Sequence, residues 1–319
     1  MAPGSPSEGM PPRGSDWLDS FTVVGTGALA RSLTRALTEH GMTCRSVHGR
    51  SRESASLLAS SISETTAPKT AACLIGDEPV LSANLTLVVV SDDALEEVAQ
   101  QLAAASIPDG QVFLHTSGVH ASSALQPLAD AGAEVGSFHP LQTFTGNEGK
   151  ERFKGITIGV EGSEVALKTA HHLADDLLAM AVTIPSDRKA LYHAAAVMAG
   201  NHAIAMLAAA ADLWERATTD AQGAHEALGP LTMQSVSNAL KIGPEAALTG
   251  PVVRGDIGTV RKHLDALQAY AAHLVPMYAA VVAETVHLAM RSGRLSTEKA
   301  VEMLDVVAKD LEPATEEKD

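Results

Sequence analysis

The sequence predicts two domains, an α/β domain with a doubly wound parallel sheet followed by an all-helical domain. At 319 residues the chain exceeds the roughly 250–300 residues at which one hydrophobic core usually stops growing. Short apolar runs alternate with helical patterns up to about Pro185, which is typical of parallel strands joined by crossover helices. From Asp187 onward the strand pattern ends, and long segments rich in Ala, Leu and Met indicate helices.

The strands of the first domain are predicted from short apolar runs that end at polar or Gly residues. Asp92 and Asp93 follow the third run and are suited to cap the next helix. The expected strands cover 21–24, 43–47, 85–90, 112–115, 134–138, 156–160 and 181–184. The expected helices cover 28–40, 53–61 and 94–105, and a further helical stretch separates the last two strands.

The second domain is expected to begin after Pro185, giving domains over 18–185 and 186–312. The segment 190–217 is apolar nearly all round, which indicates a central helix buried in its own domain or against a second subunit. Loops between helices are expected at Gly229-Pro230, Gly243-Pro244 and Gly250-Pro251. Residues 1–17 have the composition of a disordered leader, and 313–319 form an acidic tail.

The formal net charge of −15 argues against binding to nucleic acid or to an anionic membrane surface. We expect no apolar run long and charge-free enough to span a bilayer, and the leader has no apolar core typical of a signal peptide. Cys44 and Cys73 lack metal-ligand spacing and suit a reducing compartment, so a cytoplasmic protein is expected. No cluster of His, Cys, Asp and Glu has the spacing of a metal site, so no metal is expected.

A glycine-rich turn between the first strand and the first helix has the pattern G-x-G-x-x-A of a dinucleotide-binding fingerprint. The first Gly allows the tight turn, the second lets a pyrophosphate approach the backbone, and Ala30 permits close packing of helix and strand. The helix N-terminus offers free N–H groups to the phosphates; the alternative is a merely structural turn. The residues expected to bind the dinucleotide here are Gly25, Thr26, Gly27, Ala28 and Leu29, together with Ser91 and Asp92 after the third strand.

The end of the second strand favours NADP(H) over NAD(H). An NAD site would place Asp or Glu there to hold the ribose hydroxyls. This sequence instead has Arg50, Ser51 and Arg52, which can grip a 2′-phosphate through charge-assisted hydrogen bonds. The alternative interpretation is a solvated basic loop.

Over about residues 18–310 the sequence resembles a known family, the Rossmann-like proteins with a domain of unknown function numbered 2520 (DUF2520). They are relatives of pyrroline-5-carboxylate reductases, ketopantoate reductases and dehydrogenases with a helical 6-phosphogluconate-dehydrogenase-like second domain. The resemblance implies a Rossmann fold, NADP(H) and a homodimer in which helical domains pack together. The segments that carry it are VVGTGALA, GRSRESA, VVVSDDAL, HTSGVHASSAL, SFHPLQTF, LYHAAAVMAGNH and ALTGPVVRGD.

The distant reductase relatives use a helical Lys followed by an Asn on one face. If Asn201 takes the role of that Asn, the position two turns earlier is His193, and Lys189 lies one turn further back. A His and an Asn on an Ala-rich helix cost free energy unless they have partners or line a cavity. His193 and Asn201 are therefore candidate catalytic residues, with a structural core His as the alternative, and His202 is assigned a structural role.

Two loops at the carboxyl ends of strands, where doubly wound folds bind ligands, supply Ser117 and His139 as further candidates. The alternative is that His115 and His139 only shape these loops. Arg254 is placed to clamp a substrate carboxylate, with Asp256 as a helix cap or as the arginine's partner; a surface ion pair is the alternative.

The leading hypothesis, by family analogy, is an NADPH-dependent oxidoreductase acting on the C=O or C=N bond of a small 2-keto or imino acid, with ketopantoate as first candidate. In it, His193 donates the proton, Asn201 orients the carbonyl or the nicotinamide amide, and Arg254 holds the carboxylate. One alternative is a non-catalytic NADP(H)-binding sensor or scaffold. The other is a prephenate-type dehydrogenase, suggested by His139-Pro140.

Overall fold

The computed structural model describes residues 19–63, 69–77, 83–108, 110–219 and 223–308. The leader and the acidic tail expected from the sequence lie outside these residues. The chain forms two compact units, Met1–Ala199 and Gly200–Asp319, and each is described by itself below.

The first unit is built on an eight-stranded sheet with the strand order β3-β2-β1-β4-β5-β6-β7-β8. All neighbouring pairs are parallel except β6 and β7, which are antiparallel. The predicted α/β class is confirmed, and the exception has a simple cause. The segment joining β6 to β7, which is described in full, contains a 3-10 turn, Lys150–Arg152, and lacks the α-helix that usually forms the crossover between parallel strands. The strands are β1 (Ser20–Val24), β2 (Thr43–Gly49), β3 (Ala71–Leu74), β4 (Leu85–Val88), β5 (Val112–His115), β6 (Glu134–Pro140), β7 (Thr157–Gly162) and β8 (Met180–Thr183).

The edge strand β3 was not predicted. Its four residues, Ala-Ala-Cys-Leu, carry little of the β-branched and aromatic character that marks a strand. Its pairing with β2, which joins Val47 to Ala72, therefore decides its conformation.

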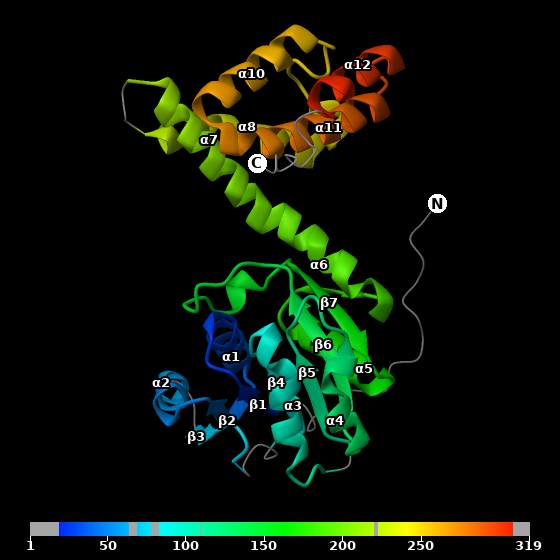
Figure 1. Ribbon diagram of the computed structural model, residues 1–319. Coiled ribbons are helices and arrows are strands. Elements are labelled where there is room, and N and C mark those ends of the chain that lie inside the picture. Colours follow the sequence, from blue (N-terminus) through cyan, green and yellow to red (C-terminus); the bar gives the residue numbers. More distant parts are fainter. Residues whose placement is uncertain (1–18, 64–68, 78–82, 109, 220–222, 309–319) are drawn as a thin grey trace, which may run out of the picture. The chain divides into compact units, whose positions relative to one another are not determined.

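Helices cover both faces of this sheet (Figure 1). One face packs against α1 (Ala28–His40), α2 (Arg52–Ser63) and α5 (Glu164–Asp176), and the other against α3 (Leu95–Ala103) and α4 (Gln126–Asp130). The expected capping by the Asp pair is wrong. Asp92 and Asp93 belong to a 3-10 turn, Asp92–Ala94, whose capping residue makes no side-chain hydrogen bond, and α3 begins only at Leu95.

The carboxyl end of β1 requires Gly25. Its φ of 121°, a left-handed value, and its contact with the next strand both exclude a side chain. A Cβ atom at this position would lie 1.9 Å from the carbonyl oxygen of Val89. The turn therefore passes directly beside the strand end. Gly27 is in an extended conformation, and α1 starts at the next residue, Ala28.

A long helical segment links the two units. It consists of α6 (Lys189–Val197), a π-helical turn (Met198–His202) and α7 (Ala203–Ala217). The units divide within this turn and not near Pro185, because α6 contacts the strand ends of the first unit through its first residues. Burial in its own domain, one of the two alternatives expected for this segment, is not observed: Leu191 is 72 % exposed in the single chain and Ile204 64 %. Burial against a second subunit stays a prediction.

The second unit, as far as it is described, is helical. Its core forms among α10 (Ile257–Tyr270), α11 (Val275–Arg291) and α12 (Thr297–Ala308), with α8 (Ala224–Ile242) and the short α9 (Pro244–Ala247) preceding them. Gly243-Pro244 and Gly250-Pro251 do mark helix boundaries. The loop predicted at Gly229-Pro230 is wrong, since Pro230 lies inside α8. A proline removes only one helical hydrogen bond, and the Ala- and Leu-rich flanks continue the helix on either side.

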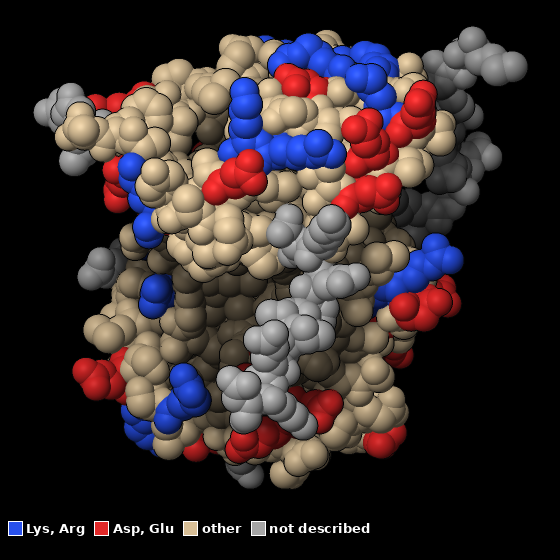
Figure 2. All heavy atoms as spheres, turned by 45° about the horizontal axis from the view of Figure 1, so that its top comes forward, with Lys and Arg blue, Asp and Glu red and all other residues tan. Residues whose placement is uncertain are grey.

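Two helical stretches among the described residues are long and apolar enough to cross a membrane by length and composition, contrary to our expectation of none. They are Ser186–Ala217, with a mean hydropathy of 1.5, and Ala272–Arg291, with 1.2. Core helices of soluble proteins also pass this test, so the finding is weak evidence. On the face of the molecule in Figure 2, basic and acidic side chains lie beside one another among uncharged residues.

Candidate active site

The glycine turn after β1 has the local geometry of a dinucleotide site. Gly25 donates its N–H to the carbonyl of His48 at 2.8 Å, which fixes the turn against β2. A Cβ atom at Gly27 would meet nothing within 4 Å, so the space above this residue is open. Gly27, the N-cap residue of α1, has no side chain that could accept a hydrogen bond from the first turn. Open space beside free helical N–H groups suits a pyrophosphate, so the residues present fit the cofactor.

The basic loop after β2 is only partly available to a ligand. Arg50 and Ser51 are exposed. Ser51 Oγ accepts the Ser54 N–H at 3.2 Å and thereby caps the start of α2. The guanidinium of Arg52 pairs with the Asp77 carboxylate at 3.1 Å. The second of the two predicted phosphate-binding arginines thus already has an anionic partner.

Lys189, the first residue of α6, is buried at the carboxyl ends of β5 and β6. Only 1 % of it is exposed. Its ammonium donates to Ser137 Oγ at 2.9 Å and to the Ser117 carbonyl at 3.3 Å. Burial lowers the pKa of Lys189 to about 8, while the carboxylates of Glu161 and Asp92 act in the opposite direction. A lysine in this state gains or loses its proton close to neutral pH.

Glu161 on β7 is a second buried charge, with 7 % of the residue exposed. One carboxylate oxygen accepts the Ser122 N–H at 2.6 Å, and the other accepts the hydroxyls of Ser122 at 2.8 Å and Ser186 at 2.7 Å. Ser122 follows β5, and Ser186 begins the 3-10 turn, Ser186–Arg188, that precedes α6. The carboxylate therefore connects the loop that accepts the Lys189 hydrogen bond with the segment that leads into the lysine's helix.

Two histidines and a tyrosine lie beside Lys189. His139 Nδ1 is 2.9 Å from the Tyr192 hydroxyl, and the two rings meet edge to face. The rings of His139 and His193 lie 5.6 Å apart between centroids. A Cβ atom at Gly118 would lie 2.8 Å from His139 Nε2 and 3.0 Å from His193 Nδ1. Gly118 therefore leaves the room in which both imidazoles approach the loop.

The surroundings of His139 and Tyr192 keep both side chains neutral at about pH 7. Burial, together with the neighbouring Lys189 and His193, lowers the pKa of His139 to about 4. Burial also raises the pKa of the Tyr192 hydroxyl to about 12. Near neutral pH, His139 is therefore an uncharged imidazole that hydrogen-bonds to the Tyr192 hydroxyl.

His115 has the structural role that the sequence left open for it. Its Nδ1 accepts the Ser117 N–H at 3.1 Å, and its Nε2 lies 3.2 Å from the Ala121 carbonyl. Because the amide can only donate, Nδ1 is unprotonated and Nε2 carries the hydrogen. Burial lowers the pKa of His115 to about 3. The ring therefore stays neutral and holds the loop, aided by Ser117 Oγ, which accepts the His120 N–H at 3.1 Å.

The structure thus brings Ser117, His139 and His193 together in the first unit. Asn201, His202 and Arg254 belong to the second unit and are exposed there. Asp256 is a helix cap: its carboxylate accepts the N–H of Thr259 at 3.0 Å and the hydroxyl at 2.7 Å.

Sequence reasoning left Lys189 aside and missed Glu161. The signal for Glu161 was its position, since this carboxylate directly follows the uncharged predicted strand 156–160. The signal for Lys189 was its spacing, since Lys189, Tyr192 and His193 stand at i, i+3 and i+4 and share one helix face.

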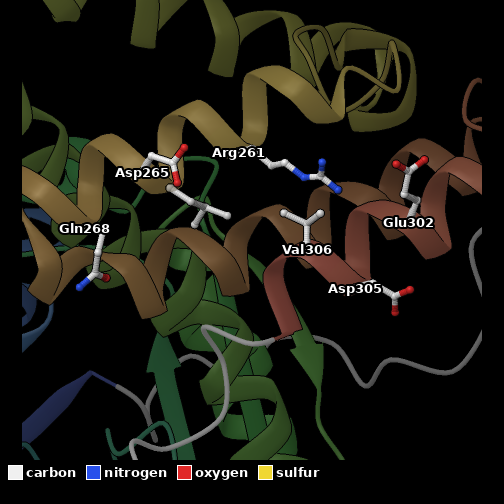
Figure 3. Close-up of a pocket in the computed structure, with 7 residues that line it drawn as sticks. Arg261, Asp265, Gln268, Glu302, Asp305 and Val306 are labelled. Atoms are coloured by element: carbon white, nitrogen blue, oxygen red, sulfur yellow. The ribbon is translucent and has the colours of Figure 1, made fainter.

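A separate hollow of about 600 Å³ lies in the second unit between α10 and α12. Figure 3 shows Arg261 and Asp265 on α10, with Glu302 and Asp305 on α12. It contains none of the residues predicted for the active site.

Two family models match the chain, the Rossmann-like domain over residues 5–140 and the domain of unknown function DUF2520 over 156–285. The chain therefore carries both domains of the family that its motifs resemble. A search of curated proteins finds no match.

Several solved structures share the fold. A candidate NADP oxidoreductase from Bacteroides fragilis is 24 % identical with a TM-score of 0.67, covering 83 % of this chain and 96 % of its own. A protein from Thermotoga maritima is 25 % identical with a TM-score of 0.65, at 85 % and 98 % coverage. A pyrroline-5-carboxylate reductase from Coxiella burnetii is 13 % identical with a TM-score of 0.54, at 88 % and 99 % coverage.

Proposed function

Because the chain carries a Rossmann-like domain and a DUF2520 domain, we propose that it is an NADP(H)-dependent oxidoreductase. The reaction proposed is reduction of the C=O or C=N bond of a small 2-keto or imino acid, with ketopantoate as first candidate. The observation that carries the proposal is the buried Lys189, which lies with His139 and His193 at the carboxyl ends of β5 and β6. Doubly wound folds bind ligands at this edge. The names of two neighbours, an NADP oxidoreductase and a reductase of a cyclic imino acid, agree with this class.

In this proposal the glycine turn and the start of α1 hold the pyrophosphate, and Arg50 and Ser51 contact the 2′-phosphate. Thr26, Ala28 and Leu29 line the same turn, and Ser91 and Asp92 follow the neighbouring strand β4. The bound NADPH would supply the hydride. Every other requirement of the reaction falls on side chains of this chain.

Hydride addition to a carbonyl or imine leaves negative charge on the oxygen or nitrogen, which needs a proton and a nearby positive charge. We assign the charge to Lys189, whose ammonium is fixed by Ser137 and the Ser117 carbonyl. His193 is half-buried and is assigned as the proton donor. Replacing His193 by Ala should then lower turnover far more than NADPH affinity.

Asn201 and Arg254 keep their proposed roles on the strength of the family resemblance alone. Asn201 would orient the carbonyl or the nicotinamide amide, and Arg254 would hold the substrate carboxylate bidentately. The cytoplasmic location is likewise proposed, and it is supported by Cys44 and Cys73, both free thiols.

We also propose a homodimer. The helices α6, α7 and α8 expose large apolar side chains in the single chain, which is typical of a surface that another protein covers. Met233 is 72 % exposed and Leu240 83 %. A second copy of the chain is the partner that the family resemblance implies.

The test is NADPH oxidation by the purified protein with ketopantoate and with a panel of small 2-keto and cyclic imino acids. NADH and a reaction without acid serve as controls. Rapid oxidation that needs both NADPH and one of the acids supports the reductase. Tight NADPH binding without turnover in either direction would favour the sensor, and NADP⁺ reduction with prephenate but with none of the 2-hydroxy acids would favour a dehydrogenase of the prephenate type.

A further inference from the structure

A cavity of about 660 Å³ lies between α1 and α2 and reaches the glycine turn. Thr26 and Arg31 line it from the turn and from α1, and Ser54 lines it from α2. The cavity therefore adjoins the end of β2, where a doubly wound fold places the 2′ position of the adenosine ribose.

A 2′-phosphate at this place calls for more positive charge than the β2 loop supplies. A phosphate monoester carries between one and two negative charges near neutral pH. Of the two arginines in the loop, Arg52 pairs with Asp77, and the same Asp77 oxygen accepts the Leu74 N–H at 2.9 Å. Among the described contacts of this loop, Arg50 is thus the arginine without an anionic partner.

Arg31 is positioned to supply a second cation. Its Nη1 donates to the Thr26 carbonyl at 3.3 Å, so the guanidinium folds back over the glycine turn. Thr26 in turn lies against the end of β2: its methyl group is 3.2 Å from the position of a Cβ at Gly49, and Ser54 Oγ is 2.9 Å from the same point.

A second loop holds the Arg31 guanidinium from the other side. A Cβ atom at Gly146 would lie 2.6 Å from both Nε and Nη2 of Arg31, and its φ of 97° also favours glycine. The carboxylate of Glu148 fixes this loop to α1 by accepting the Ser32 hydroxyl at 2.8 Å and the Thr145 N–H at 2.9 Å. The exposed guanidinium therefore lies between the glycine turn and this loop, and it has five N–H donors in all.

We propose that Arg31 binds the 2′-phosphate of NADP(H) together with Arg50 and is a determinant of NADP(H) over NAD(H) specificity. The inference rests on the proposed function, because it takes NADP(H) as the ligand of the glycine turn. It assigns to α1 a contact that the sequence pattern placed only in the loop after β2.

Arg35 provides a matched control. It lies one turn further along α1, lines the same cavity, is also exposed and donates to the Asn147 carbonyl at 2.7 Å. Its removal changes the charge of the protein as much as removal of Arg31 does, but it lacks the contact with the glycine turn.

The experiment is calorimetric titration of the full chain with NADPH and with NADH, for the wild type, Arg31→Ala, Arg31→Lys and Arg35→Ala. Thermal unfolding of each variant checks that it is folded. We expect Arg31→Ala to weaken NADPH binding about tenfold or more, as for loss of a charge-assisted pair, and to leave NADH binding within about twofold. Arg31→Lys should lie between, and Arg35→Ala should match the wild type.

Equal weakening of NADPH and NADH in a folded Arg31→Ala variant, or no weakening of either, would overturn the inference while leaving the proposed cofactor in place. An equal loss of NADPH affinity in Arg35→Ala would overturn it as well, since net charge alone would then explain the effect. If the wild type binds neither dinucleotide, the proposed function fails and the inference fails with it.

Discussion

At Lys189 a charged side chain loses nearly all contact with water and gains two acceptors, Ser137 Oγ and the Ser117 carbonyl. Burying an ammonium without a full counter-charge at hydrogen-bond distance is unfavourable, which is why its pKa falls to about 8. Such shifted groups are concentrated at functional sites. The neighbouring His139 and Tyr192 stay neutral, so Lys189 is the fixed charge that they surround.

Replacing Lys189 by Met should lower turnover by about 10²-fold or more while leaving NADPH affinity nearly unchanged, because the lost charge acts on the reacting atoms. In the wild type, turnover should fall as pH rises through about 8, where Lys189 loses its proton. Steady-state rates of the wild type and of the Lys189→Met variant, measured from about pH 6 to 10, would check both statements. An unchanged alkaline limb in a Lys189→Met variant that still turns over would contradict the assignment.

The glycine turn and the strand β7 have different roles in the protein. Gly25 is required by the fold, since a Cβ would collide with the Val89 carbonyl, whereas Gly27 borders open space. Glu161 connects three elements through Ser122 and Ser186. These contacts allow structural and ligand-binding roles to be separated by paired substitutions.

Gly27→Ala should fold like the wild type and lose NADPH affinity by about tenfold or more, because its methyl group enters the space left for the pyrophosphate. Gly25→Ala should instead lower the melting temperature, since both its φ and its close contact oppose a side chain. Thermal unfolding and NADPH titration of the two variants check this. A Gly27→Ala protein that binds NADPH normally would argue against the turn as the cofactor site.

Glu161→Gln should lower the free energy of unfolding by about 1–3 kcal/mol. The NH₂ group of the new amide is a donor, and it would face N–H and O–H groups whose hydrogen bonds the carboxylate now accepts. The measurement is urea unfolding at about pH 7, with linear extrapolation of the free energy of unfolding to zero denaturant. Glu164→Gln is the control, because its pair with Lys168 is exposed and its loss should matter little. Equal effects of the two changes would show that the Glu161 network adds no stability.

Across the whole molecule, the sequence predicted best those elements whose conformation depends on residues nearby in the chain. The uncharged runs predicted the strands β1 and β4. The glycine turn predicted a dinucleotide-binding site. The strand β3 and the helix through Pro230 depend on tertiary pairing and on flanking helix formers, which override local propensity. Lys189 was overlooked because its partners Ser117 and Ser137 lie far away along the chain, and only the fold brings them together.

The helix α8 exposes an apolar face in the single chain, and we expect a second copy of the chain to cover it. If two copies cover it, light scattering during gel filtration should give twice the chain mass of 33.0 kDa. Leu240→Glu combined with Met233→Glu should then yield the monomer mass, because both side chains are exposed in the single chain. Leu57→Glu, also an exposed leucine but on α2, should leave the dimer intact. A wild-type monomer at micromolar concentration would refute the dimer.

The most direct test of the central claim is transfer of label from NADPH deuterated at the nicotinamide C4 to the substrate. The wild-type protein, ketopantoate and a cyclic imino acid would be incubated with this cofactor, and the products would be examined by mass spectrometry. We predict a reduced acid that carries the deuterium on the former carbonyl or imine carbon, formed with NADPH in preference to NADH. Unlabelled acids of every class tested, recovered unchanged beside tightly bound NADPH, would contradict it and identify the protein as a binder of the cofactor instead of a reductase.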